Sequence, residues 1–139
     1  MPPNKNPVRA VTRDGLVGRL ADFDRVVEIG VGHRPAVARE LAARGVDVTA
    51  TDICDRQLPA GVRFVRDDVT DPTLSVYAEA DALYALNLPP ELHGAVSRLA
   101  DRIDSAFLFT TLGGDPPTVP VGRETVPGET VFVYDAQRA

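Results

Sequence analysis

The sequence predicts an α/β protein of three layers, in which a doubly wound, mostly parallel sheet carries helices on both faces and ends in an antiparallel hairpin. Short runs of β-branched and apolar residues alternate along the chain with amphipathic segments. Glycine or proline stands at most of the boundaries between them. The last two strand-like runs instead follow each other across Pro127 and Gly128, with no helical segment between them. Alternation of strand and helix favours a parallel sheet, which the final pair of strands closes.

The first half of the chain begins with an amphipathic helix and continues with three strand-like runs. The first run ends in a tight glycine turn, and Pro35 and Gly45 suit the beginning and the end of the helix that follows. Between the second and third runs, residues 53–61 are too few, and too interrupted by Pro59, to form a crossover helix. The expected elements are helices over 8–20 and 35–45 and strands over 25–29, 46–52 and 62–65.

The second half carries the clearest helix of the sequence. Its apolar residues Leu92, Val96, Leu99 and Ile103 recur at alternating intervals of four and three, which places them on one face. A Gly-Gly-Asp-Pro-Pro turn separates the fifth strand from the hairpin. The expected elements are helices within 72–80 and over 92–103, and strands over 82–86, 105–112, 119–126 and 130–134.

Length and composition match one soluble domain, residues 1–139. Of the 139 residues 44% are hydrophobic and 25% charged, and no apolar run is long enough to span a membrane. The beginning of the chain has no apolar run of the signal-peptide type. Cys54 is the only cysteine, which excludes an internal disulfide and a cysteine zinc cluster. We therefore expect a cytoplasmic protein.

The charged residues show an unusual bias. The formal net charge is −5, and Lys5 is the only lysine among 15 Lys and Arg residues. This choice of residues resembles that of proteins from salt-loving archaea or from high-GC genomes. An acidic domain is also a poor partner for nucleic acid, which leaves a local arginine patch as the alternative route to such a partner.

Candidate ligand-binding residues follow the first strand, because open α/β sheets bind ligands beyond the carboxyl ends of their strands. Glu28 precedes Gly30 and Gly32, two glycines that let the backbone turn sharply and approach a ligand closely. A dinucleotide fingerprint requires glycine at position 35, where this chain has Pro35. A carboxylate at Glu28 repels a pyrophosphate but attracts an ammonium group. The turn therefore favours a cationic amino-acid group and disfavours a nicotinamide cofactor. The alternatives are that both glycines serve the turn alone and that Glu28 is an inward-facing polar residue at the end of the strand.

Glu28-x-Gly30-x-Gly32 after a first strand resembles the leading motif of class I S-adenosylmethionine-dependent methyltransferases, in which an acidic residue precedes three alternating glycines. Arg34 stands in place of the third glycine. The resemblance implies a methyltransferase-like Rossmann fold that binds S-adenosylmethionine, with Glu28, Gly30 and Gly32 around its methionine part. Arg34 either pairs with Glu28 or a neighbouring aspartate, or occupies ligand space.

The same resemblance assigns roles at the ends of the next two strands. It implies that Asp52, after the second strand, holds the ribose hydroxyls through two hydrogen bonds. It also implies that an acidic residue after the third strand faces the adenine amino group. Asp67 and Asp68 both stand there, and we favour Asp68.

The fourth strand ends in Asn87-Leu88-Pro89-Pro90, which resembles the Asn-Pro-Pro-aromatic segment of many methyltransferases with one residue inserted and no aromatic. Nearly the whole chain is similar to a small archaeal family of uncharacterised proteins with this fold. Two functions follow: an S-adenosylmethionine-binding methyltransferase of unknown acceptor, or a degenerate, non-catalytic structural or interaction module. Since the sheet uses most of the sequence, we expect a second copy or a partner protein to complete the cleft.

The remaining reactive residues give weaker indications. We expect His33 and His93 at the surface, with His33 as a less favoured candidate for a general base. Neither histidine has the spacing of a metal ligand, so no metal site is expected. The sequence assigns no catalytic residue.

Overall fold

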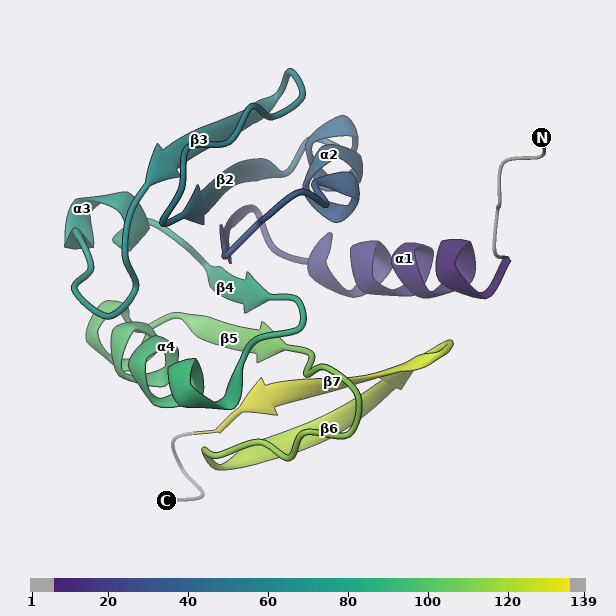
Figure 1. Cartoon of the computed structure of the whole chain (residues 1–139). Coiled ribbons are helices and arrows are strands. Elements are labelled where there is room, and N and C mark those ends of the chain that lie inside the picture. Colours follow the sequence, from purple (N-terminus) through teal and green to yellow (C-terminus); the bar gives the residue numbers. More distant parts are fainter. Residues whose placement is uncertain (1–6, 136–139) are drawn as a thin grey trace.

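The computed structural model describes residues 7–135, which form one sheet between two layers of helices (Figure 1). The elements in chain order are α1 (Pro7–Leu20), β1 (Arg25–Ile29), α2 (Ala36–Ala43), β2 (Asp47–Asp52), β3 (Val62–Arg66), α3 (Leu74–Tyr77), β4 (Ala82–Ala85), α4 (Pro90–Ile103), β5 (Ala106–Phe109), β6 (Val121–Val126) and β7 (Glu129–Tyr134). No helix within this part of the chain is long and apolar enough to cross a membrane.

The sheet has seven strands in the order β3-β2-β1-β4-β5-β7-β6. Strands β1 to β5 pair in parallel, whereas β7 runs antiparallel to both β5 and β6. The predicted fold, a doubly wound and mostly parallel sheet with a C-terminal antiparallel hairpin, is confirmed. The hairpin folds back so that its second strand lies inside the sheet and its first strand forms the edge. The carboxyl ends of β1, β2 and β4 meet along one edge of the sheet.

The two layers of helices bury opposite faces of the same strands. Successive strand residues point to opposite faces, so that Val26 and Tyr84 pack with α1 and α2, whereas Val27 and Leu83 pack with α3 and α4. Each large apolar side chain buried in this way contributes about 1.5–3 kcal/mol to folding. This packing fixes which side chains of β1 and β4 face each layer.

Three connections are shorter than in a full α/β sandwich. The predicted helix within 72–80 is a single turn, Leu74–Tyr77, and residues 53–61 contain no helix, as expected. The predicted fifth strand over 105–112 ends at Phe109, and a loop over 110–120 connects it to the hairpin. Both helix-free connections begin at the carboxyl edge of the sheet, after β2 and after β5.

The hairpin packs against α1. A Cβ atom added at Gly15 would lie 3.0 Å from both the Val126 Cβ and the Pro127 Cδ atoms, so only glycine fits there without adjustment. The Thr12 hydroxyl donates to the Pro127 carbonyl at 2.6 Å. The Arg19 guanidinium reaches Glu124 on β6 at 2.6 Å. Helix α1 therefore positions the hairpin relative to the sheet.

Candidate functional site

The chain leaves β1 through residues 30–35, here called the glycine loop. Gly30 and Gly32 have φ values of 73° and 58°, and a Cβ atom added to either would meet no protein atom within 4 Å. These backbone conformations, rather than crowding, require glycine. The N–H groups of Gly30 and Val31 both donate to the Thr51 carbonyl, at 2.9 and 3.0 Å. The loop is thereby fastened to the end of β2.

Asp52 ends β2 and joins the glycine loop to the following segment. One carboxylate oxygen accepts the Gly32 N–H at 2.8 Å, and the other accepts the Cys54 N–H at 3.0 Å. Burial alone would raise the pKa of Asp52, but these two N–H groups and the Arg56 guanidinium hold it below its usual value. The carboxylate is therefore ionised and fixed in direction against the glycine loop.

Glu28 lies beneath the glycine loop rather than at its surface. Its side chain is 1% exposed, and the Tyr84 hydroxyl donates to it at 2.8 Å. Burial raises the pKa of Glu28 to about 8; the Tyr84 hydrogen bond opposes this shift and the Asp52 charge adds to it. Burial and the Glu28 charge likewise raise the pKa of Tyr84. Near neutral pH the Glu28 carboxyl is mostly protonated.

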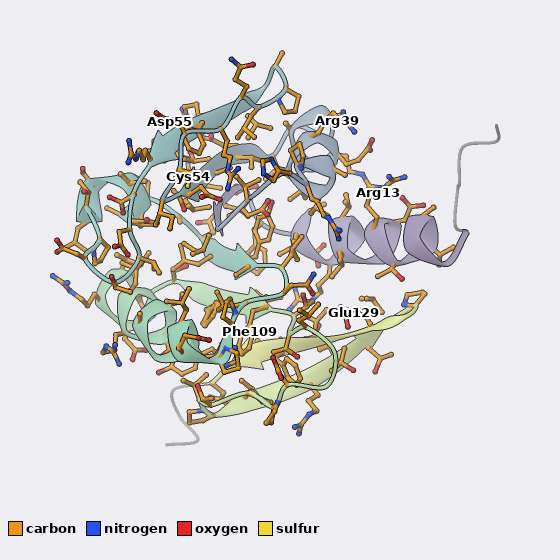
Figure 2. All side chains as sticks on the ribbon, viewed as in Figure 1. Arg13, Arg39, Cys54, Asp55, Phe109 and Glu129 are labelled. Atoms are coloured by element: carbon orange, nitrogen blue, oxygen red, sulfur yellow. The ribbon has the colours of Figure 1, made fainter. Side chains whose placement is uncertain are left out.

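Arg56, which no sequence pattern singled out, lies in the helix-free segment after β2. Its guanidinium lies 3.5 Å from the Asp52 carboxylate and 2.9 Å from the Nε2 atom of His33. Its side chain is about 20% exposed, and its Nε atom is buried without a hydrogen-bond partner in the described part of the chain. Figure 2 shows Cys54 and Asp55 on the same segment. Arg56 therefore bridges the glycine loop and the end of β2.

Arg34, the residue in place of the third glycine, has an exposed side chain. It forms no ion pair with another described residue. The predicted pairing with Glu28 is not formed, because Glu28 is buried against Tyr84. His33 is exposed, as expected, and contacts Arg56.

The two aspartates after β3 have different environments. Asp67 accepts the Tyr77 hydroxyl at 2.6 Å and the Thr73 N–H at 3.2 Å, so it holds α3 in place. Asp68 is exposed and accepts both the N–H and the hydroxyl of Thr70, which lower its pKa. Asp68 is thus the member of the pair that stays at the surface.

The end of β4 is held by the end of β5. Asn87 has a φ value of 54°, a left-handed conformation that asparagine tolerates better than most residues. Its N–H donates to the Thr110 hydroxyl at 2.8 Å, and the Leu88 N–H donates to the Thr110 carbonyl at 2.9 Å. The Asn87 side chain makes no hydrogen bond with another described residue and faces the hollow described next.

A hollow of about 490 Å³ lies between Asn87, the loop after β5 and the hairpin. It is here called the hairpin hollow. Its lining combines apolar residues, among them Leu112 and Phe132, with polar and charged residues. The lining residues are Asn87, Thr111, Leu112, Gly113, Gly114, Asp115, Pro116, Pro117, Arg123, Glu129, Thr130 and Phe132.

The expectation that His93 lies at the surface is wrong. The helix α4 begins at Pro90, and His93 is fully buried on the same face as Val96 and Ala100. Its Nδ1 atom accepts the Thr118 N–H at 3.2 Å, so its Nε2 atom carries the hydrogen that bonds to the Leu88 carbonyl at 3.0 Å. His93 therefore ties the loop after β5 to the end of β4, and the only sequence signal was its helical spacing from Val96 and Ala100.

Comparison with known proteins identifies the family. The model of the uncharacterised protein family UPF0146 matches residues 14–137. The chain belongs to this family. A UPF0146 protein of Halobacterium salinarum is 56% identical over 115 residues, which cover 82% of this chain and 89% of the relative. A UPF0146 protein of Archaeoglobus fulgidus is 44% identical over 91 residues, covering 66% of this chain and 70% of the relative.

Solved structures similar to this UPF0146 protein include methyltransferases. An RNA methyltransferase from Salinibacter ruber, in complex with S-adenosyl-L-homocysteine, superposes with a TM-score of 0.59 at 17% identity and covers 96% of this chain and 92% of its own. Magnesium protoporphyrin IX methyltransferase from Synechocystis, with bound S-adenosylmethionine, gives a TM-score of 0.62 at 16% identity, covering 97% and 87%. At these identities the likeness shows the fold. The predicted resemblance in family and fold is therefore confirmed for this UPF0146 protein.

Proposed function

We propose that this UPF0146 protein binds S-adenosylmethionine at the carboxyl ends of β1 and β2 and transfers its methyl group to an acceptor. The observation that carries the proposal is Asp52, an ionised carboxylate at the end of β2 that is fixed against the glycine loop by the Gly32 N–H. Ligands of open α/β sheets bind beyond the carboxyl ends of the strands, which supports this position for the ligand.

The residues present fit such a ligand. Gly30 and Gly32 leave space in front of the loop, because an added Cβ atom would meet no protein atom there. The two Asp52 oxygens are the acceptors for the ribose hydroxyls. Asp68, exposed after β3, is the proposed partner of the adenine amino group. When bound, S-adenosylmethionine supplies an activated methyl group.

Glu28 acts on the ligand through its charge rather than through an open contact surface. An ammonium group held at the glycine loop favours the ionised form of this buried carboxyl and so lowers its pKa from about 8. Binding therefore releases a proton near neutral pH, and affinity is expected to rise as pH increases toward 8. Transfer of the methyl group then depends on the positioning of the acceptor more than on acid–base groups of the protein.

Calorimetric titration with S-adenosylmethionine and S-adenosylhomocysteine in molar potassium chloride tests the proposal. Asp52→Ala is expected to weaken binding about 100-fold, because the ribose loses its charged acceptor and the glycine loop loses its anchor. Asp47→Asn is the matched control, since Asp47 begins the same strand at the opposite edge of the sheet. Absence of binding to the unaltered protein at millimolar ligand would contradict the proposal.

A non-catalytic module is the second candidate, and Arg56 favours it. The guanidinium lies against the carboxylate that the ribose would use, and Arg34 replaces a glycine of the motif. In such a module the cleft would instead meet a second copy or a partner protein. Unchanged ligand affinity in Asp52→Ala, together with a partner that still co-purifies, would support this second candidate.

A further inference from the structure

We infer that this UPF0146 protein forms a dimer in which β3 of one copy pairs antiparallel with β3 of a second copy, so that the sheet continues across a two-fold axis. Strand β3 is an edge strand, and Figure 1 shows it at the outer margin of the sheet. It is the only described strand without a buried residue. An edge strand presents unpaired N–H and C=O groups, which a further strand can join.

The pairing of β3 with β2 determines which backbone groups face outward. Asp52 stands in register with Arg66, and its carbonyl accepts the Asp67 N–H at 3.0 Å. Residues along a strand direct their N–H and C=O groups to alternate sides, so the odd-numbered residues of β3 bond to β2. The N–H and C=O groups of Phe64 and Arg66 therefore point away from the sheet. The Val62 carbonyl does so too, whereas the Val62 N–H is bonded within its own chain.

A two-fold axis through Phe64 uses most of these outward groups. The two copies of Phe64 then stand directly opposite each other and exchange both of their backbone hydrogen bonds. The Arg66 N–H of each copy donates to the Val62 carbonyl of the other. The half-buried Phe64 rings form a cross-strand aromatic pair, a favourable contact in antiparallel sheets. The strand therefore offers matching groups to a second copy of itself, which a two-fold contact requires.

The charged side chains of β3 do not block this edge. Arg63 pairs with Asp47 on β2, and the Arg66 Nε atom donates to the Ile53 carbonyl at 2.9 Å. Both guanidinium groups are thus engaged within their own chain. In the dimer each arginine stands opposite a valine of the second copy, so no like charges face each other directly.

The other edge of the sheet, β6, is less suited to such a contact. Its middle residues are Arg123 and Glu124, and a two-fold axis through either one sets that residue opposite its own copy. Like charges directly opposite each other destabilise a strand pair. Pairing between two copies of the chain therefore favours β3 over β6.

The contact is small and adjoins the carboxyl edge of the sheet. Paired strands of five residues bury less surface than most stable dimers, so we expect a dissociation constant on the order of 10 µM. Antiparallel pairing brings the turn before β3 of the second copy beside Asp67 and Asp68. A second copy would thus border the proposed ligand cleft, while the dimer itself does not depend on the proposed function.

Sedimentation velocity of the full chain in molar potassium chloride, from about 1 to 300 µM, tests the dimer. The average mass is expected to rise from monomer to dimer over this range. Arg66→Pro and Arg66→Ala form a matched pair, because both remove the side chain but only proline removes the outward N–H. Proline is tolerated where the N–H of an edge strand faces solvent. Arg66→Pro is expected to weaken the dimer at least about tenfold relative to Arg66→Ala, with circular dichroism showing that both variants are folded.

Cross-linking in a Cys54→Ser background tests the register. Phe64→Cys places two thiols directly opposite each other, where Cα atoms lie about 5.5 Å apart and a disulfide can form. Arg63→Cys is the control on the same strand, because its two thiols are offset along the strands, with Cα atoms more than about 7 Å apart. Under mild oxidation the Phe64→Cys chain is expected to form covalent dimer at least about fivefold faster.

Three results would overturn the inference. They are a chain that stays monomeric up to the highest concentration, equal dimerisation of the two Arg66 variants, and faster cross-linking of Arg63→Cys than of Phe64→Cys. A monomeric chain would leave the edge of β3 to a strand of another protein. Titration with S-adenosylhomocysteine tests the proposed function separately, since neither sedimentation nor cross-linking requires the ligand.

Discussion

Two neighbouring parts of the carboxyl edge differ in how they satisfy their polar groups. Around the glycine loop, the polar groups bond to one another: Tyr84 to Glu28, Gly32 to Asp52, and Arg56 to Asp52 and His33. In the hairpin hollow, the Asn87 amide and the Asp115 carboxylate have no described protein partner. Around the glycine loop, a ligand would meet polar groups that already bond to one another and are fixed in direction. The hairpin hollow instead has polar groups without a described protein partner.

The largest expected effect concerns Glu28, the buried carboxyl beneath the glycine loop. The pKa of Glu28 is raised from 4.5 to about 8, mainly by burial, so the folded state keeps a proton that the unfolded state releases. The proton on Glu28 therefore stabilises the folded state fully below about pH 4.5. This stabilisation is lost as pH rises to about 8, at roughly 1.4 kcal/mol per pH unit. Glu28→Gln stays neutral and keeps an acceptor for Tyr84. At alkaline pH, the free energy of unfolding of Glu28→Gln is expected to exceed that of the unaltered protein by several kcal/mol.

Urea unfolding between about pH 5 and pH 9 measures this difference. Glu40→Gln, an exposed residue of α2, removes a surface carboxylate as a control. The result expected is a curve for Glu28→Gln that separates from the other two as pH rises. Parallel curves for all three proteins would mean that Glu28 is ionised without cost. The part around the glycine loop would then hold a charged Glu28 carboxylate instead of a neutral carboxyl.

The second prediction concerns the packing of the β6–β7 hairpin against α1. At Gly15 an added methyl group would lie 3.0 Å from the Val126 Cβ atom, whereas Gly18, on the same helix, has no atom within 4 Å of an added Cβ. Gly15→Ala is expected to be about 1–3 kcal/mol less stable than Gly18→Ala, which gains about 1 kcal/mol from helix propensity. Thermal unfolding measures the difference. Affinity for S-adenosylhomocysteine should not change in either variant; a loss in Gly15→Ala would show that the two halves are coupled.

The glycine loop was predictable from the sequence because its contacts join neighbouring strands through the backbone. Glu28, Gly30, Gly32 and Asp52 fall at the ends of two strands that parallel pairing brings together. An inward-facing Glu28 was one of the alternatives, but its partner Tyr84 was not predictable, because it depends on which face of β4 meets α1 and α2. Arg56 was not predicted, because its segment lacks the periodicity that would indicate which way its side chains point.

The hairpin hollow could not be predicted at all. Its lining joins Asn87 to residues around 111–117 and 123–132, which come together only because β7 inserts between β5 and β6. The sequence indicates a hairpin but not which of its strands pairs with the sheet. The burial of His93 was not predicted either. The helix α4 begins at Pro90, two residues before the predicted start, and its course places His93 on the buried face.

The third prediction concerns Arg56, whose contacts with Asp52 compete with a ribose. Its 3.5 Å approach to the carboxylate is long for an ion pair, and its buried Nε atom lacks a described partner. Displacing it therefore costs little, and Arg56→Ala is expected to bind S-adenosylhomocysteine about three- to tenfold more tightly. Arg66→Ala is the matched control, since Arg66 bonds to the Ile53 carbonyl instead. Weaker binding in Arg56→Ala would show that the guanidinium contacts the ligand.

The smallest effect concerns the ion pair between Arg19 on α1 and Glu124 on β6. Its side chains are 29% and 43% exposed, so solvent screens the attraction. A double-mutant cycle with Arg19→Ala and Glu124→Gln, read by urea unfolding, is expected to give a coupling of about 0.2–1 kcal/mol that shrinks in molar salt. The hydrogen bond from Arg19 lowers the pKa of Glu124, so the coupling is present above about pH 4.5 and is lost as acid protonates the folded state. If the cycle instead gave several kcal/mol, charge rather than the contact of Gly15 with Val126 would hold the hairpin in place.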